Sequence, residues 1–123
     1  MFRGCVSLNP SISHWDVSNI TNMRALLQQT LFNQNIGIWD ITSVSNFQDF
    51  IKITNALTTA NYDAILIGWE ATLQATYPSG SGYTPIISVD FGGAEYTGGG
   101  AAATARASLI SNFSWSITDG GIA

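Results

Sequence analysis

The sequence contains an internal repeat that covers most of its first half. Residues 8–23 (LNPSISHWDVSNITNM) align with residues 32–47 (FNQNIGIWDITSVSNF), and each copy carries a Trp-Asp pair, at 15–16 and at 39–40. Four further aligned positions are apolar in both copies, namely 8 and 32, 17 and 41, 20 and 44, and 23 and 47, and no third copy follows. A chain built this way is expected to place its two copies in equivalent structures that stack on one another.

The period and the spacing of the apolar residues favour a solenoid. Leucine-rich repeats have periods of roughly 20–29 residues, each unit being a short strand with a helical or irregular return, and the offset from Leu8 to Phe32 falls in that range. Ile12-x-x-Trp15-x-Val17 and Ile36-x-x-Trp39-x-Ile41 follow the L-x-x-L-x-L spacing of such strands. We therefore expect an α/β fold in which residues 1–56 form a short leucine-rich-repeat-like solenoid of about two coils, with a strand through each Trp-Asp pair.

A strand at each Trp-Asp pair would separate a core face from an exposed face, because alternate side chains of a strand point to opposite sides. Trp15 and Val17, like Trp39 and Ile41, are expected in the core. The residues between them form the candidate ligand-binding face: His14, Asp16, Ser18, Ile38, Asp40 and Thr42. Stacking of the coils would bring Asp16 and Asp40 to roughly 5 Å from one another.

Other chemistry at these positions has less support. His14 and Asp16 have no nucleophile at a motif spacing, so no catalytic residue is predicted. Asp16 with Asp40 falls short of the roughly six to eight oxygen ligands of calcium, which makes a metal the minority interpretation, and no cofactor is predicted. The two tryptophans fit the core pattern better than a sugar-stacking platform. The repeated Asn9 and Asn33 are interpreted as structural, because their amides can satisfy main-chain groups of the next coil.

The first copy also carries a family resemblance. MFRGCVSLNPSISHWDVSNITNM resembles the repeat of the BspA-like leucine-rich-repeat surface proteins of bacteria, which some phage and viral genomes also encode. The second copy departs from the pattern, with Leu26-Leu27, Thr30 and Ser45 at the Met-Phe, Cys and Thr positions. The resemblance places Met1 inside a repeat, so it implies that the chain is the C-terminal end of a repeat array together with its closing segment, either as a piece of a longer array or as the product of a short gene that retained this end.

Residues 57–123 are expected to form an α/β cap that is continuous with the repeats. A helix is predicted from Thr58 or Thr59 to about Gln74, because its apolar residues recur on one helical face. That face consists of Tyr62, Ile65, Leu66, Trp69 and Leu73. A strand is predicted at 86–91, a second helix at 101–110 after a glycine run, and a closing strand at 113–118. Such a unit would cover the exposed core of the last coil.

Charge and composition exclude several partners. The chain has four Lys and Arg residues against eight Asp and Glu residues, for a net charge of −4. Four scattered cations are too few for a nucleic-acid interface or for an anionic membrane surface. The polar surface is supplied instead by 13 Ser, 12 Thr and 9 Asn residues. Cys5 is the single cysteine and has no internal disulfide partner.

The expected function is a non-enzymatic binding or adhesion module that uses the exposed sheet face. The resemblance implies an extracellular, cell-surface or virion location and a protein or other host-surface macromolecule as partner. No membrane insertion is expected, because the longest apolar stretch, from Ala64 to Trp69, is too short to span a bilayer. The alternative is a structural or assembly domain, such as a phage fibre or tip component, whose open N-terminal edge docks on another subunit or on further repeats. A glycan hydrolase ranks third, because it requires a carboxylate pair in a cleft.

Overall fold

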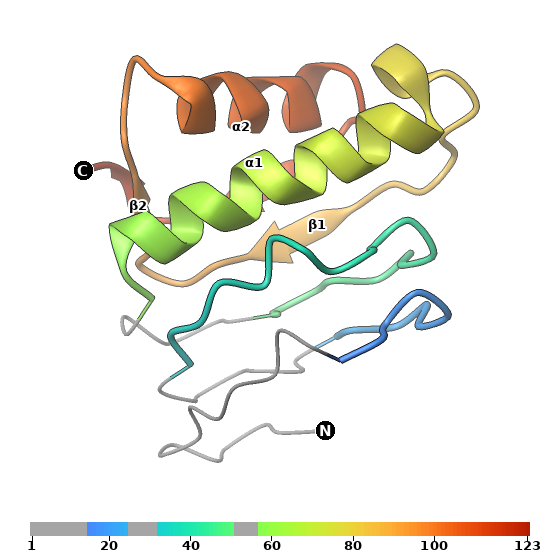
Figure 1. Cartoon of the computed structure of the whole chain (residues 1–123), viewed down its shortest axis with the longest axis horizontal. Helices are drawn as coiled ribbons and strands as arrows, with labels where there is room; N and C mark the ends of the chain where they lie inside the picture. Colours follow the sequence, from blue (N-terminus) through green and yellow to red (C-terminus); the bar gives the residue numbers. More distant parts are fainter. Residues whose placement is uncertain (1–14, 25–31, 51–56) are drawn as a thin grey trace.

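The structure is a computed structural model and describes residues 15–24, 32–50 and 57–123 (Figure 1). This part of the chain mixes helices with short strands. The helices are α1 (Thr59–Thr76), α2 (Ala101–Ser111) and the 3-10 turn η1 (Pro78–Gly80). The strands are β1 (Ser88–Asp90), β2 (Glu95–Tyr96), β3 (Ser116–Thr118) and β4 (Gly121–Ile122). β1 pairs with β3 and β2 with β4, both in parallel, so α2 serves as the crossover that parallel strands need.

Helix α1 confirms the prediction for this segment. It begins after Thr58, whose hydroxyl accepts a hydrogen bond from the Asn61 N–H at 3.3 Å, the usual role of an N-cap threonine. Its buried side chains are the five of the predicted apolar face. It ends two residues later than predicted. The second helix is one residue longer than predicted, and the two strands are shorter than predicted because only part of each predicted segment pairs.

The two copies of the repeat lie side by side, with equivalent positions, 24 residues apart, in register. Asn22 and Asn46 form an isolated parallel bridge. The Met23 N–H donates to the Asn46 carbonyl at 2.7 Å, and the Ser45 N–H donates to the Thr21 carbonyl at 2.8 Å. Equivalent positions of the two copies are therefore neighbours where the main chains meet.

The strand predicted through each Trp-Asp pair is wrong. The chain turns there, with the Ile20 N–H donating to the Val17 carbonyl at 2.9 Å and the Val44 N–H donating to the Ile41 carbonyl at 3.1 Å. The physical reason is that an aspartate can accept from main-chain and hydroxyl groups two residues ahead, which competes with strand pairing. The predicted core residues of these segments still face inward: Val17, Trp39 and Ile41 are buried, and Trp15 is partly buried against the core.

Helix α1 packs directly on the main chain of the second copy. Gly37 and Gly68 meet so closely that a Cβ atom on Gly68 would overlap the Gly37 carbonyl, and one on Gly37 would overlap the Ala64 carbonyl. The Trp69 indole N–H donates to the Ile36 carbonyl at 2.9 Å, and the ring stacks on Phe47 with centroids 5.2 Å apart. Buried residues of the repeats and of the cap form one cluster as a result.

Asn33 adds a polar link at the start of α1. Its side-chain oxygen accepts from the Thr58 N–H at 2.9 Å and from the Asn61 side-chain amide at 2.8 Å. Asn33 therefore has a structural role, as predicted, although the N–H that it satisfies belongs to the start of α1 and not to the next coil. Its counterpart Asn9 lies outside the described residues.

Within the cap, the carboxylate of Asp119 connects both helices to the chain end. Its side chain is 4% exposed and accepts from the Tyr62 hydroxyl at 2.5 Å and from Nε of Arg106 at 2.9 Å. Burial of Tyr62, followed by the hydrogen bond from its hydroxyl to Asp119, raises the pKa of this hydroxyl well above its ordinary value. The Arg106 guanidinium also lies over the Tyr96 ring, 4.8 Å from its centroid.

The close approach of Gly37 and Gly68 predicts the effect of Gly68→Ala. Alanine favours a helix interior over glycine by about 1 kcal/mol, whereas overpacking against fixed main chain costs about 1–3 kcal/mol. We expect a net loss of up to about 2 kcal/mol in the free energy of unfolding, measured by urea denaturation followed by circular dichroism. Gly100→Ser is the control, because a Cβ there meets no atom within 4 Å. A Gly68→Ala protein more stable than the parent would contradict this packing.

Candidate binding surface

The same aspartate turn is made in both copies of the repeat. Oδ1 of Asp16 accepts from the Ser18 N–H at 3.0 Å and from the Ser18 hydroxyl at 2.6 Å. Oδ1 of Asp40 accepts from the Thr42 N–H at 3.0 Å and from the Thr42 hydroxyl at 2.6 Å. Each turn thus holds a carboxylate and a hydroxyl in a fixed relation. The Ser18 hydroxyl, and to a lesser degree its N–H, lowers the pKa of the Asp16 carboxyl.

The structure places five of the six predicted site residues at or near the surface. Asp16 and Asp40 are exposed, Ser18 and Thr42 are half-buried, and the Ile38 side chain is 74% exposed. His14 lies outside the described residues. Both turns lie on the same side of the molecule, and the bridge between Asn22 and Asn46 begins two residues after each turn (Figure 1). We call the residues of the two turns, together with the exposed Ile38 two residues before Asp40, the turn surface: Asp16, Ser18, Ile38, Asp40 and Thr42.

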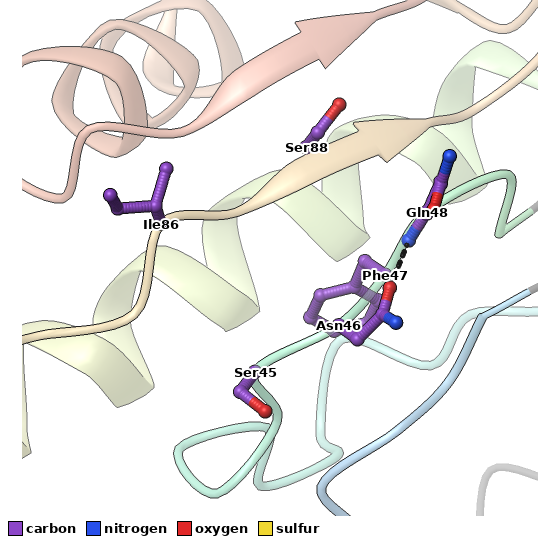
Figure 2. Close-up of a pocket in the computed structure, with 6 residues that line it drawn as sticks. All are labelled: Ser45, Asn46, Phe47, Gln48, Ile86 and Ser88. Carbon is purple, nitrogen blue, oxygen red and sulfur yellow. Dashed lines mark hydrogen bonds between the residues drawn. The ribbon is translucent and has the colours of Figure 1, made fainter.

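A second surface lies where the repeats meet the cap. Residues 45–48 run alongside β1, with β3 beyond it, and α1 lies behind them (Figure 2). Phe47 and Val89 are each 1% exposed and belong to the core. The side chains of Ser45 and Ser88 are short and polar and reach solvent on the face opposite to the core.

A cavity of about 290 Å³ separates residues 45–48 from β1 (Figure 2). Its lining side chains are uncharged, and we call them the junction groove: Ser45, Asn46, Phe47, Gln48, Ile86 and Ser88. Two hydroxyls and two amides supply hydrogen-bonding groups, while Ile86, 87% exposed, supplies an apolar one. The volume is near the lower end of the roughly 300–1,000 Å³ of small-molecule sites.

The walls of the junction groove carry main-chain groups directed into it. Across the described residues, no main-chain hydrogen bond joins 45–48 to 86–90. The Ile87 carbonyl and the Phe91 N–H, on either side of β1, form hydrogen bonds with the strand β3. Because main-chain groups of successive strand residues point in opposite directions, the N–H and carbonyl of Ser88 point away from β3, toward the groove. Asn46 directs both its N–H and its carbonyl to the first copy.

The sequence does not indicate the junction groove. Asn22 and Asn46 are identical in the aligned copies, but the apolar pattern predicts a strand at the Trp-Asp pair, ahead of the residues that actually pair. Ile86 and Ser88 follow much later in the chain, in a segment with no repeat signal. Only the packing of the cap brings them beside the second copy.

The described side chains offer no metal cluster. Over residues 15–24, 32–50 and 57–123, no group of three or more His, Cys, Asp or Glu residues is placed to hold an ion. The helices in that part of the chain are also too short or too polar to cross a membrane. What the turn surface and the junction groove offer is hydrogen bonding and apolar contact.

Comparison of the sequence with known protein families identifies one family that matches it. The family described as "Mycoplasma protein of unknown function, DUF285" matches residues 1–69, more than half of the chain. The chain belongs to the DUF285 family. Members of this family occur among BspA-like surface proteins. No curated protein and no solved structure gave a significant match to this DUF285 protein.

The turn in the first copy predicts an acid-shifted titration of Asp16. Because folding lowers the pKa of Asp16, the ionised carboxylate stabilises the turn at every pH above the ordinary pKa of 3.8. This stabilisation is lost as the pH falls through the pKa of the folded state. NMR titration of the side-chain carboxyl should place the pKa of Asp16 below 3.8, and Ser18→Ala should raise it. Thr42→Ala, the equivalent change in the second copy, should leave Asp16 unaffected. A carboxyl that titrates alike in the parent and in Ser18→Ala would disprove the turn.

Proposed function

We propose that this DUF285 protein is a non-enzymatic binding or adhesion module of a bacterial cell surface or a virion. In this proposal residues 1–56 form about two coils of a leucine-rich-repeat-like solenoid, and residues 57–123 are its α/β cap, in one continuous unit. The parallel bridge between equivalent positions of the two copies supports the coils. Membership in a family that occurs among BspA-like surface proteins supports the extracellular location.

The observation that carries the proposal is the repeated aspartate turn. Two equivalent turns present a carboxylate and a hydroxyl with matching hydrogen bonds, and the exposed Ile38 comes two residues before Asp40 of the second turn. Repetition of a fixed polar group at a regular spacing suits recognition of an extended macromolecule, because each copy contributes a similar contact. Ile38 adds an apolar anchor, since an exposed large apolar side chain gains free energy when a partner covers it.

The chemistry of the turn surface supports binding over catalysis. Each aspartate is engaged by the hydroxyl and the N–H of its own turn. A lowered pKa at Asp16 keeps this carboxyl ionised, which suits an acceptor of hydrogen bonds better than a general acid. A protein or another macromolecule of a host surface, rather than a nucleic acid, is the partner that we propose, because the chain carries a net charge of −4.

Binding to cells tests the proposal. The fluorescently labelled full chain is incubated with cultured animal epithelial cells and bound protein is measured by flow cytometry. Ile38→Ser should lower binding about fivefold, which corresponds to roughly 1 kcal/mol of apolar contact. Asp16→Asn combined with Asp40→Asn should lower it further, because the amide oxygen retains the turn while the charge is lost.

Matched controls separate the turn surface from the rest of the molecule. Ile122→Ser removes another exposed isoleucine, 63% exposed, and should bind like the parent. Glu95→Gln removes an exposed charge of the cap with the same expectation. Unchanged binding by the folded Ile38 and aspartate variants would reject the turn surface. A defined oligomer in light scattering, with no binding to cells, would favour the assembly domain instead.

A further inference from the structure

We infer that the junction groove binds an extended peptide, which adds to the free edge of β1 by main-chain pairing. The inference rests on the proposed binding function and assigns to it a second surface and a ligand class. It concerns residues 45–48 and 86–88, which the turn surface does not include. Strand addition to an unpaired sheet edge is a recurring mode of peptide recognition, in which the main chain supplies affinity and alternate side chains supply specificity.

The main chain of β1 offers the pairing groups. The N–H and the carbonyl of Ser88 point away from β3 and into the groove, where they can bond to the two residues of an added parallel strand that flank its register partner. Exposed strand edges of this kind act as templates for another chain unless they are covered.

The side chains of the groove suit a peptide better than a sugar. Sugars bind to exposed aromatic faces, but Phe47, the aromatic residue of the groove, is 1% exposed. The Asn46 side-chain oxygen accepts from the Gln48 N–H at 2.9 Å, which leaves the Asn46 NH2 group and the exposed Gln48 amide to meet the polar groups of a peptide main chain. Ile86, 87% exposed at the entrance, can cover one apolar side chain of the peptide.

Charge near the groove selects the peptide further. Asp90 lies two residues after Ser88 and therefore on the same side of β1. One of its oxygens accepts from the Gly92 N–H at 2.7 Å, which fixes the carboxylate in a half-buried position. A peptide strand that pairs with Ser88 passes this carboxylate, so a Lys or Arg side chain at that position is favoured and an acidic one is disfavoured.

Peptide titrations followed by NMR test the inference on the full chain. The probe is an acetylated and amidated hexapeptide, Thr-Val-Thr-Val-Lys-Thr. Three comparison ligands are titrated in the same way: the peptide with Glu in place of Lys, the peptide with N-methylated central residues, and chitotetraose. Amide shifts should centre on Ile86, Ser88 and Phe47. The Lys peptide should bind at least threefold more tightly than the Glu peptide, and the N-methylated peptide should bind at least tenfold more weakly.

Variants separate main-chain pairing from other contacts. Ser88→Pro removes the N–H that faces the groove, and because that N–H takes no part in the pairing with β3, the sheet should remain while affinity falls at least tenfold. Ile86→Ser keeps the main chain and should weaken binding about fivefold, which makes the test independent of how Ser88→Pro folds. Ile122→Ser is the matched control and should bind the peptide like the parent.

Each outcome decides between the alternatives. Because the inference assigns most of the affinity to the main chain, an absence of shifts with millimolar Lys peptide would overturn it. Shifts with chitotetraose alone would identify a sugar site, and equal binding of the N-methylated peptide would exclude strand addition. Cell binding that is retained while all peptides fail would reject the inference and leave the proposed function standing. Peptide binding in a protein that does not bind cells would reject the proposed function instead.

Discussion

The structure depends on the contact of two glycines, Gly37 in the second copy of the repeat and Gly68 in α1. Their lack of side chains allows the helix to rest on the main chain of the repeat, where Trp69 hydrogen-bonds to the Ile36 carbonyl and stacks on Phe47. The dispersion and hydrophobic contributions to the stability of the fold both increase with such close packing. The contact fixes the position of α1, and through α1 the positions of α2 and of the strands that follow.

The aspartate turns show how local chemistry overrides a periodic pattern. The spacing of Trp15 and Val17 fits a strand, and the two residues do face inward, yet Asp16 accepts two hydrogen bonds from Ser18 and the chain turns. Parallel pairing therefore begins later, at Asn22 and Asn46. The same sequence pattern thus produces an exposed polar turn followed by a short paired segment, and the surface that we propose for recognition lies at the turns instead of on a flat sheet face.

The junction groove follows from the way the cap continues the layer of the repeats. β1 runs beside residues 45–48, but its pairing groups on that side meet no main-chain partner among the described residues. The register that aligns the two copies does not extend into the cap, since Ile86 and Ser88 belong to a segment of different sequence. A mismatch between a repeat and its cap leaves an open edge, and an open edge is a site where another chain can pair.

The sequence by itself determined the period of the repeat, the inward positions of Val17, Trp39 and Ile41, and helix α1 with its cap Thr58 and its buried face. These features depend on local periodicity and on capping, which neighbouring residues encode. Tertiary structure alone decided that Gly37 meets Gly68, that Asp119 joins Tyr62 to Arg106, and that Ser88 comes to lie beside Asn46. Such pairs are far apart in the chain, and their contact depends on how whole elements pack, which no local pattern specifies.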